Sequence, residues 1–200
     1  MIKKRCIVID RQYGSGGREV GKLLSTQYDM PLYDRELLLI AAERYGLNPG
    51  VMEALDEKRS GSLLHDIAMF AGSLQNYTRL QEPYERYQAI SDTIRRLALE
   101  GPCVFIGRCA DTVLKDVCKF VNVFIYASDM AQRVRRAHEV DHIEMNHIET
   151  YILRRDEQRR EYRRHFSGGG WGVMENYDLC LNTSILGYQK CADIIAGLME

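Results

Sequence analysis

Short apolar runs alternate along the chain with longer stretches in which apolar residues recur at helical spacing. Three runs are apolar for most of their length, at residues 5–10 (RCIVID), 103–106 (CVFI) and 120–126 (FVNVFIY). Strands buried on both faces have this pattern, because helices cover both sides of a parallel sheet. Two shorter runs, at residues 30–33 (MPLY) and 177–181 (YDLCL), predict two further strands.

Helices are predicted between these strands. In residues 17–28, Val20, Leu23 and Leu24 recur at the spacing of one helix face. Asp129 precedes another helical stretch and is expected to cap it, since its side-chain oxygen accepts hydrogen bonds from free amides. The other predicted helices cover residues 35–44, 53–58, 63–74, 82–100 and 143–166, the last ending at a glycine run, and a closing helix runs from about 186 to 199.

The order of these elements predicts an α/β fold. Strands separated by helices favour a parallel sheet that is covered on both faces. No strand pattern interrupts residues 35–100, so this segment is expected to be a long helical insertion. The 200 residues, 46% of them hydrophobic, are enough for one substantial core. We therefore expect one domain over residues 1–200.

Charge and cysteine content disfavour several classes of function. Lys and Arg together number 27 against 28 for Asp and Glu, so binding of nucleic acid or membrane through overall charge is not expected. No run approaches the roughly 18 apolar residues of a membrane span, and no signal-peptide core follows the first residues. A soluble, cytoplasmic protein is expected. The six cysteines form no C-x-x-C pair, which predicts free thiols and no metal site.

The clearest chemical signal is the glycine-rich segment between the first strand and the first helix. A turn in this place directs backbone N–H groups and the helix dipole toward an anion. The common phosphate-loop pattern is G-x-x-x-x-G-K-[ST], in which the lysine reaches the β and γ phosphates. Aligned on Gly16, the chain has Arg11 at the first glycine, Gly17 at the lysine and Arg18 at the hydroxyl position.

This alignment predicts a phosphate cradle without its lysine. Arg18, at the start of the helix, is expected to supply the positive charge that the lysine would give. The alternative is that the glycines make only a tight connection between strand and helix. The residues expected to bind phosphate are Gly14, Ser15, Gly16, Gly17, Arg18 and Glu19.

A second cluster of positive charge lies in residues 152–166 (ILRRDEQRREYRRHF). Arg155, Arg159 and Arg163 are spaced four residues apart, so they lie on one face of a helix, where they can meet several phosphate oxygens. The alternative is a solvated helix with pairs such as Asp156 with Arg160 or Glu157 with Arg160. A helix that binds nucleic acid is disfavoured by the balanced overall charge.

Six segments together resemble the cytidylate kinase-like family, a branch of the P-loop nucleoside monophosphate kinases. They are IDRQYGSGGREVGKLL, PLYDRELL, VFIGRCAD, VFIYASDMAQRVRR, RRDEQRREYRRHF and YDLCLNTS, in that order along the chain. The resemblance implies a P-loop NTPase fold of three αβα layers with a five-stranded parallel sheet. Its core would comprise residues 1–34, 101–142 and 171–200, with a helical monophosphate-binding insertion at 35–100 and a lid at 143–170.

The resemblance also implies a reaction and the residues that carry it. Members of the family transfer the γ-phosphate of ATP to CMP or dCMP with Mg²⁺, so ATP, Mg²⁺ and small-molecule nucleotides are the expected ligands. Arg18, Arg155 and Arg159 would be catalytic, with no metal ligand assigned among the side chains. The acceptor would be bound by Asp34, Arg35, Arg108, Asp156 and Arg159.

The chain departs from the family pattern at several of these positions. Cys109 replaces the aspartate of a G-R-D turn, Arg35 stands where a base-contacting serine is expected, and Ile152 replaces an arginine. With Gly17 in place of lysine, three hypotheses follow. The protein is a kinase for a nucleoside monophosphate or a related small molecule, a nucleotide-binding regulatory protein without turnover, or an interaction protein that uses its arginine-rich helix.

Overall fold

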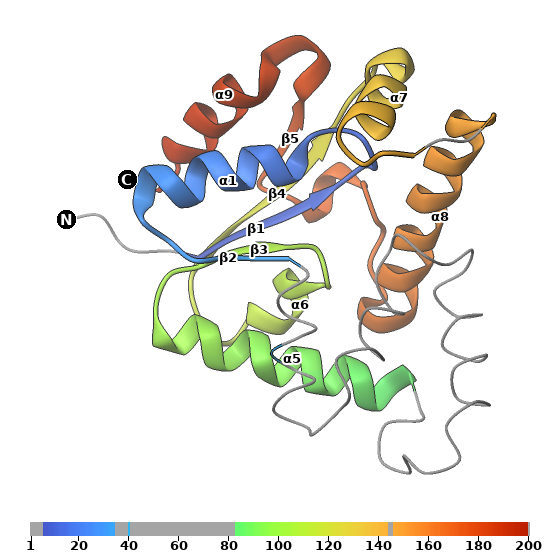
Figure 1. Cartoon of the computed structure of the whole chain (residues 1–200). Helices are drawn as coiled ribbons and strands as arrows, with labels where there is room; N and C mark the ends of the chain where they lie inside the picture. The colour runs from blue at the N-terminus through green and yellow to red at the C-terminus, as the bar shows by residue number, and fades with distance from the viewer. Residues whose placement is uncertain (1–5, 35–39, 41–82, 144–145, 200) are drawn as a thin grey trace.

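The computed structural model describes residues 6–34, 40, 83–143 and 146–199. In this part of the chain, strands and helices alternate as the apolar pattern predicts (Figure 1). The strands are β1 (Cys6–Arg11), β2 (Leu32–Tyr33), β3 (Val104–Ile106), β4 (Phe120–Tyr126) and β5 (Leu179–Asn182). The helices are α1 (Gly17–Tyr28), α5 (Pro83–Glu100), α6 (Ala110–Leu114), α7 (Met130–Glu139), α8 (Ile148–Ser167) and α9 (Thr183–Ala196), with a 3₁₀ turn at Met174–Asn176.

The five strands form one sheet in the order β2-β3-β1-β4-β5. Each pair is parallel, and β1 is central, with Ile7 in register with Val104 on one side and Val121 on the other. This confirms the predicted five-stranded parallel sheet. The carboxyl ends of the strands meet at one edge, which is where ligands bind in open α/β folds.

Helices cover both faces of the sheet. On one face, α1 and α9 bury residues such as Val20 and Ile195 against Ile7 and Ile9. On the other face, Ile94 of α5 and Leu114 of α6 pack with Val8 and Phe105. Figure 1 shows α1 and α9 above the sheet and α5 and α6 below it. Residues 6–9 of β1 are all apolar because each face of the strand meets a helical layer.

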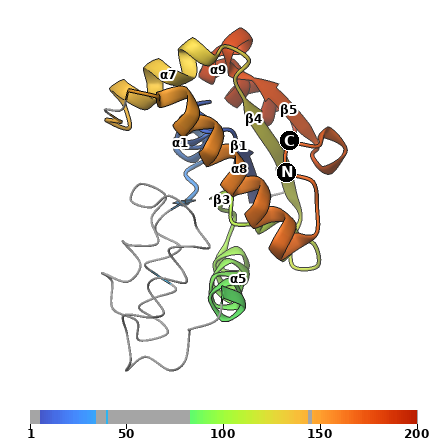
Figure 2. The same cartoon turned by 90° about the vertical axis from the view of Figure 1, so that its right-hand side faces the viewer.

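α7 and α8 lie beyond the carboxyl edge of the sheet, next to the loop that follows β1 (Figure 2). Tyr13 of this loop is buried in a small apolar cluster with Ala137 of α7 and Ile152 of α8. Asp129 caps α7 by accepting hydrogen bonds from the amides of Ala131 and Gln132, as predicted. The packing therefore holds the arginine-rich helix against the glycine-rich loop.

Several predicted boundaries are wrong. The polar helix expected over residues 143–166 begins only at Ile148. The closing helix begins at Thr183, because Asn182 caps it through the amide of Ser184, and Gly187 interrupts it with a φ of 73°. The short helix α6 was not predicted. Apart from Ile40, the helices expected at residues 35–44, 53–58 and 63–74 lie outside the described residues, as does Arg35, so the insertion and the domain division remain predictions. None of the described helices is long and apolar enough to cross a membrane.

Candidate functional site

The loop between β1 and α1 is shaped by two glycines with left-handed backbone. Gly14 has a φ of 73° and Gly16 a φ of 79°. A Cβ on Gly14 would lie 2.8 Å from the carbonyl oxygen of Arg133, and one on Gly16 would lie 2.2 Å from the ring of Tyr188. Both positions therefore require glycine for conformation and for space. The loop is packed tightly on its outer side by α7 and α9.

The first turn of α1 is open on the side of the loop. Gly16 is the N-cap residue, and no side chain of the described chain caps this helix. The first amides of a helix have no partner within it, and together with the helix dipole they favour an anion. The residues that carry them, Gly17, Arg18 and Glu19, line a cavity above the loop, which we call the loop cavity.

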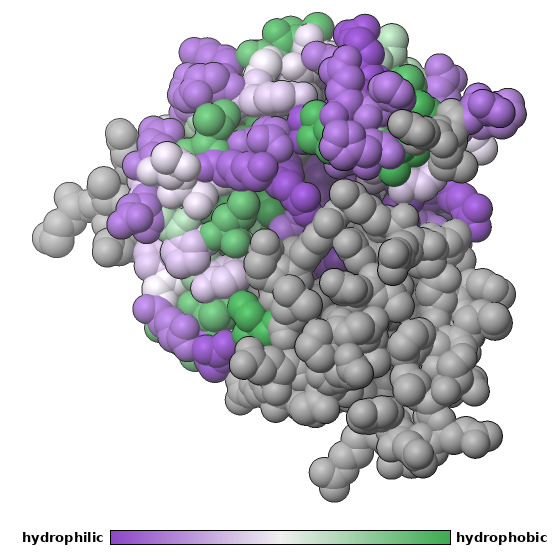
Figure 3. Space-filling model, in the orientation of Figure 1, coloured by the Kyte–Doolittle hydropathy of each residue, from purple (hydrophilic) through white to green (hydrophobic). Residues whose placement is uncertain are grey.

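Positive charge predominates in the loop cavity. Among the described residues that line it, five are cationic and three are acidic. Figure 3 shows that hydrophilic residues gather on this face over α7 and the region of the loop. The cationic residues are Arg11, Arg18, Lys22, Arg136 and Arg159, and the acidic residues are Glu19, Asp34 and Asp141. The cavity therefore combines the amide end of a helix with a net positive lining, as a phosphate site requires.

The side chains of Arg18, Ser15 and Glu19, which were predicted to bind phosphate, already have hydrogen-bond partners in the protein. Arg18 points to Asp34, which accepts from its Nε at 2.6 Å and also from its Nη2. The hydroxyl of Ser15 is buried and lies within hydrogen-bonding distance of the carbonyls of Gln12 and Ile125, its amide donates to the carbonyl of Gln12, and Ser15 does not line the loop cavity. Burial alone would raise the pKa of Glu19, but the hydrogen bond from Arg136 and the charge of Lys22 hold that pKa below its ordinary value.

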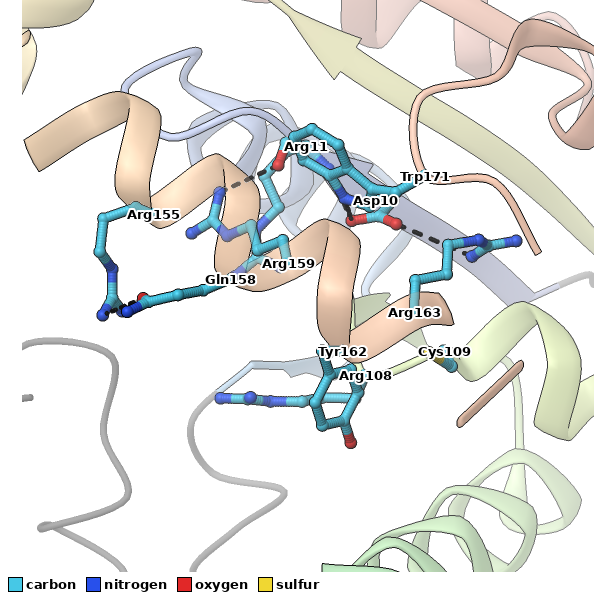
Figure 4. A pocket seen from close by; sticks show the side chains of 10 residues that line it. All are labelled: Asp10, Arg11, Arg108, Cys109, Arg155, Gln158, Arg159, Tyr162, Arg163 and Trp171. Carbon is cyan, nitrogen blue, oxygen red and sulfur yellow. Dashed lines mark hydrogen bonds and ion pairs between the residues drawn. The ribbon is translucent and has the colours of Figure 1, made fainter. Parts of the chain in front are cut away.

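A second cavity lies beside the first, between α8 and the ends of β1 and β3. We call it the arginine cavity (Figure 4). Among the described residues that line it, five arginines face one carboxylate, that of Asp10. The arginines are Arg11, Arg108, Arg155, Arg159 and Arg163, and the remaining lining residues are Cys109, Gln158, Tyr162 and Trp171. Such a lining favours a ligand with several negative charges.

Arg108 enters this cavity from a strained turn. Arg108 and Cys109 have φ values of 60° and 53°, in the left-handed region that non-glycine residues rarely adopt. The Nε of Arg108 and the hydroxyl of Tyr162 are buried without a hydrogen-bond partner among the described residues. Burial raises the pKa of Tyr162, so its hydroxyl remains neutral. Figure 4 shows the two side chains lying alongside each other, so the cavity contains polar groups that a ligand can satisfy.

Arg11 and Arg159 line both cavities. The Nη1 of Arg159 donates to the backbone carbonyl of Arg11 at 2.9 Å, which joins α8 to the end of β1. Arg155 lies one turn earlier on α8 and binds Gln158 through its Nη1 at 2.9 Å. These two arginines therefore lie where the two cavities adjoin.

Asp10 and Asp111 form hydrogen bonds with side chains that line the arginine cavity. Asp10 accepts from the indole Nε1 of Trp171 at 3.1 Å and from the hydroxyl of Tyr177 at 3.2 Å. Asp111 accepts two hydrogen bonds from the buried guanidinium of Arg163, at 3.0 and 2.7 Å. Burial raises the pKa of Cys109 to about 12, so this thiol is neutral. These pairs fix the positions of the side chains around the cavity.

Asp156, which the resemblance assigned to the acceptor, lines neither cavity. Its Oδ1 accepts from the amide of Tyr13 at 2.7 Å, and its Oδ2 pairs with Arg133. Arg133 also donates through its Nε to the carbonyl of Tyr13 at 2.7 Å. Asp156 and Arg133 are both buried, so Asp156 does not pair with Arg160; Glu157 does. The pair of Asp156 and Arg133 connects α8 and α7 to the glycine-rich loop.

The side chains fit a nucleotide better than a magnesium ion. The amide end of a helix and several arginines suit a polyphosphate, but position 18 carries an arginine where the usual loop has a metal-binding hydroxyl. The carboxylate of Asp34 is paired with Arg18, and the described residues contain no cluster of three potential metal ligands. The described side chains around the loop therefore do not form a magnesium site by themselves, and a Mg²⁺ ion that arrived with a nucleotide would be held by phosphates and water.

Some residues of the site were not identified from the sequence. Arg11, Arg133 and Arg136 were not assigned roles, although all three contact the loop or its lining. For Arg11 a signal was present, because it occupies the first glycine position of the phosphate-loop pattern. Arg133 and Arg136 lie in a helix with no motif of its own, so only the tertiary structure reveals them.

Comparisons with known proteins agree with this geometry. A model of the cytidylate kinase-like family matches residues 6–185, so the chain belongs to that family. No curated protein matches the chain. A solved structure of an uncharacterized protein from Eubacterium ventriosum is 21% identical over 98% of both chains, with a TM-score of 0.70.

Two shikimate kinases are more distant structural neighbours. The enzyme from Acinetobacter baumannii, solved with shikimate, is 10% identical, with a TM-score of 0.54, over 99% of this chain and 94% of that one. The enzyme from Bacteroides thetaiotaomicron is 14% identical over 98% of both chains, with a TM-score of 0.52. At these identities the likeness concerns the fold, which is that of a P-loop kinase with three αβα layers.

Proposed function

We propose that this member of the cytidylate kinase-like family transfers the γ-phosphate of ATP to a small acceptor that itself carries negative charge, such as CMP or dCMP. The observation that carries the proposal is the pair of adjoining cavities that meet at Arg11 and Arg159. One cavity has the open amides of a helix and suits a polyphosphate, and the other has an arginine lining and suits a second anion.

The loop cavity is the donor site in this proposal. The amides at the start of α1 and the side chains of Arg136 and Lys22 would contact the β and γ phosphates of ATP. Gly14 and Gly16 let the loop curve around the phosphates with its outer side packed on α7 and α9, where a side chain at either position would collide. ATP would bring its Mg²⁺ with it, and that ion would neutralise part of the phosphate charge.

The arginine cavity is the acceptor site. Arg108, Arg155 and Arg163 would bind the acceptor's phosphate, and the unpartnered Nε of Arg108 would gain a partner. An acceptor oxygen attacks the γ-phosphorus, the bond to the bridging oxygen of the β-phosphate breaks, and ADP leaves. This reaction needs positioned charge and no protein nucleophile, and the phosphate of a nucleoside monophosphate needs no base at neutral pH. Arg159 and the helix amides would stabilise the charge on the transferred group.

An ADP-release assay tests the proposal most simply. Purified protein is given ATP with Mg²⁺ and CMP, dCMP, UMP, AMP or GMP, each singly, and thermal unfolding is followed on the same sample. The expected result is stabilisation by ATP, as mass action requires of a ligand of the folded state, and ADP release that depends on one monophosphate. A matched pair of variants, Arg159→Met and Arg154→Met, separates the site from the exposed side of α8.

In this pair, only Arg159→Met is expected to lower turnover, because Arg154 lines neither cavity. Equal loss in both variants would mean that the charge of α8 acts non-specifically, which contradicts the proposal. Absence of both stabilisation and ADP release would also contradict it.

A nucleotide-binding protein without turnover is the second candidate. It is favoured by the pairing of Arg18 with Asp34, which neutralises the cation next to the missing lysine, and by the arginine at position 18, which provides no hydroxyl for a metal. Stabilisation by ATP without ADP release for any acceptor would support this function over the kinase.

A further inference from the structure

We infer that Arg11 replaces the lysine of the phosphate loop, and that Gly17 is a glycine because the side chain of Arg11 fills the space beside it. The inference rests on the proposed function, since it names the residue that would bind the transferred phosphoryl group. It also gives a reason for two departures from the loop pattern at once. The usual loop has a glycine at the position of Arg11 and a lysine at the position of Gly17, whereas this chain has an arginine at the first and a glycine at the second.

The contact between the two positions is steric. A Cβ on Gly17 would lie 2.7 Å from the Cβ of Arg11 and 3.0 Å from its Cγ. These atoms are at the root of the Arg11 side chain, which the end of β1 holds in place, so rotation of the side chain cannot relieve the overlap. Gly17 has no left-handed φ that would itself require glycine. Space for Arg11 is therefore the reason why no lysine stands at position 17.

The path of the Arg11 side chain leads into the site. Its Nη1 lies against Gly107, where an added Cβ would be 2.3 Å away, and its Nη2 lies 3.7 Å from the Oδ1 of Asp34. The side chain is only 11% exposed, so its position is held by packing before any ligand arrives. The guanidinium thus lies at the boundary of the two cavities, both of which Arg11 lines.

This position suits a ligand of the γ-phosphate. A guanidinium can hold two phosphate oxygens at once, and a group held in place beforehand loses little freedom when it binds. Asp34 can keep the guanidinium oriented while a phosphate approaches from the cavity side. Arg159, which is hydrogen-bonded to the backbone carbonyl of Arg11, would then contact the γ-phosphate from α8.

Three variants test the inference. Arg11→Met is expected to lower turnover by roughly 100- to 1000-fold, the usual loss when one preorganised donor to the transition state is removed. It should weaken binding of ATP much more than binding of ADP, because ADP lacks the phosphate in question. Gly17→Lys alone should also lose activity, since the new side chain collides with Arg11. The double variant Arg11→Gly with Gly17→Lys, which restores the usual pattern, should be more active than either single variant.

The readouts separate failure of this inference from failure of the proposed function. If wild-type protein shows neither ATP binding nor ADP release, the proposed function fails and the inference with it. If the wild type is active but Arg11→Met is equally active, only the inference fails. Equal loss of ATP and ADP affinity in Arg11→Met would mean that Arg11 has a structural role, and a Gly17→Lys variant as active as wild type would refute the steric argument. Arg154→Met serves as the control for loss of one arginine.

Discussion

The buried pair of Asp156 and Arg133 allows a quantitative test of how the site is held together. Replacing Asp156 by alanine removes the acceptor of the Tyr13 amide and the partner of the Arg133 guanidinium. The side chain of Arg133 is only 5% exposed, so its guanidinium cannot turn to water when Asp156 is removed. Removing one partner of a buried ion pair costs about 3–5 kcal/mol, because the other charge stays buried.

The size of this loss distinguishes two roles for Asp156. For a protein of this length, each kcal/mol shifts the melting temperature by roughly 2–4 °C, so Asp156→Ala should melt roughly 6–20 °C lower without any ligand. Urea unfolding measures the same quantity as a free energy. The control is Glu157→Ala, the next residue on α8, whose exposed pair with Arg160 is worth at most about 1 kcal/mol.

A second substitution tests the cause of the loss. Arg133→Met in the Asp156→Ala background removes the orphaned charge and should recover part of the stability, so that the two losses are not additive. The reasoning is refuted if Asp156→Ala unfolds within about 0.5 kcal/mol of wild type. If it then raised the KM for the acceptor alone, Asp156 would be an acceptor ligand, as the resemblance to the family implied.

Further predictions concern the loop, the arginine cavity and the thiol. Gly16→Ala should cost about 2–4 kcal/mol in urea unfolding, from its positive φ and its overlap with the ring of Tyr188. Tyr188→Ala should relieve part of that cost, and no relief would contradict the overlap. Asp111→Ala should lower the free energy of unfolding by about 3 kcal/mol, because it leaves the buried Arg163 with only the more distant carboxylate of Asp10. An unchanged free energy of unfolding would contradict this reasoning. Cys109, with a pKa raised by burial to about 12, stays protonated at pH 8 and should resist iodoacetamide in native protein while reacting in urea, as mass spectrometry can show.

Much of the sheet could be predicted because its signal is local. Residues 120–126 are apolar over nearly their whole length and form β4 with those bounds, and the helical spacing of Val20, Leu23 and Leu24 predicts α1 over 17–28 as observed. Burial on both faces removes the polar alternation that would otherwise obscure a strand. The α/β class and the parallel sheet follow from the order of such segments.

The site was less accessible because it depends on contacts between distant residues. The Nε of Arg133 donates to a carbonyl 120 positions away in the chain, at Tyr13. The spacing of Arg155, Arg159 and Arg163 correctly placed them on one face of α8, lining the arginine cavity, but it could not show which neighbours they would meet.

The exchange at positions 11 and 17 shows the same limit. Sequence alignment reveals that the lysine is absent, and it led to Arg18 as the replacement. Only the structure shows that Arg18 is held by Asp34 and that the side chain of Arg11 lies over Gly17. A motif position identifies what is missing, whereas three-dimensional packing brings a candidate replacement, Arg11, to the same place.

The central claim is that a triphosphate lies in the loop cavity with its last phosphate beside Arg11. A crystal structure of the protein with a non-hydrolysable ATP analogue tests this directly. The account predicts β and γ phosphates at the amides of Gly17 and Arg18, and a γ-phosphate oxygen within hydrogen-bonding distance of the Arg11 guanidinium. A triphosphate bound elsewhere, or one whose γ-phosphate contacts Arg18 while Arg11 stays turned to Asp34, would contradict it.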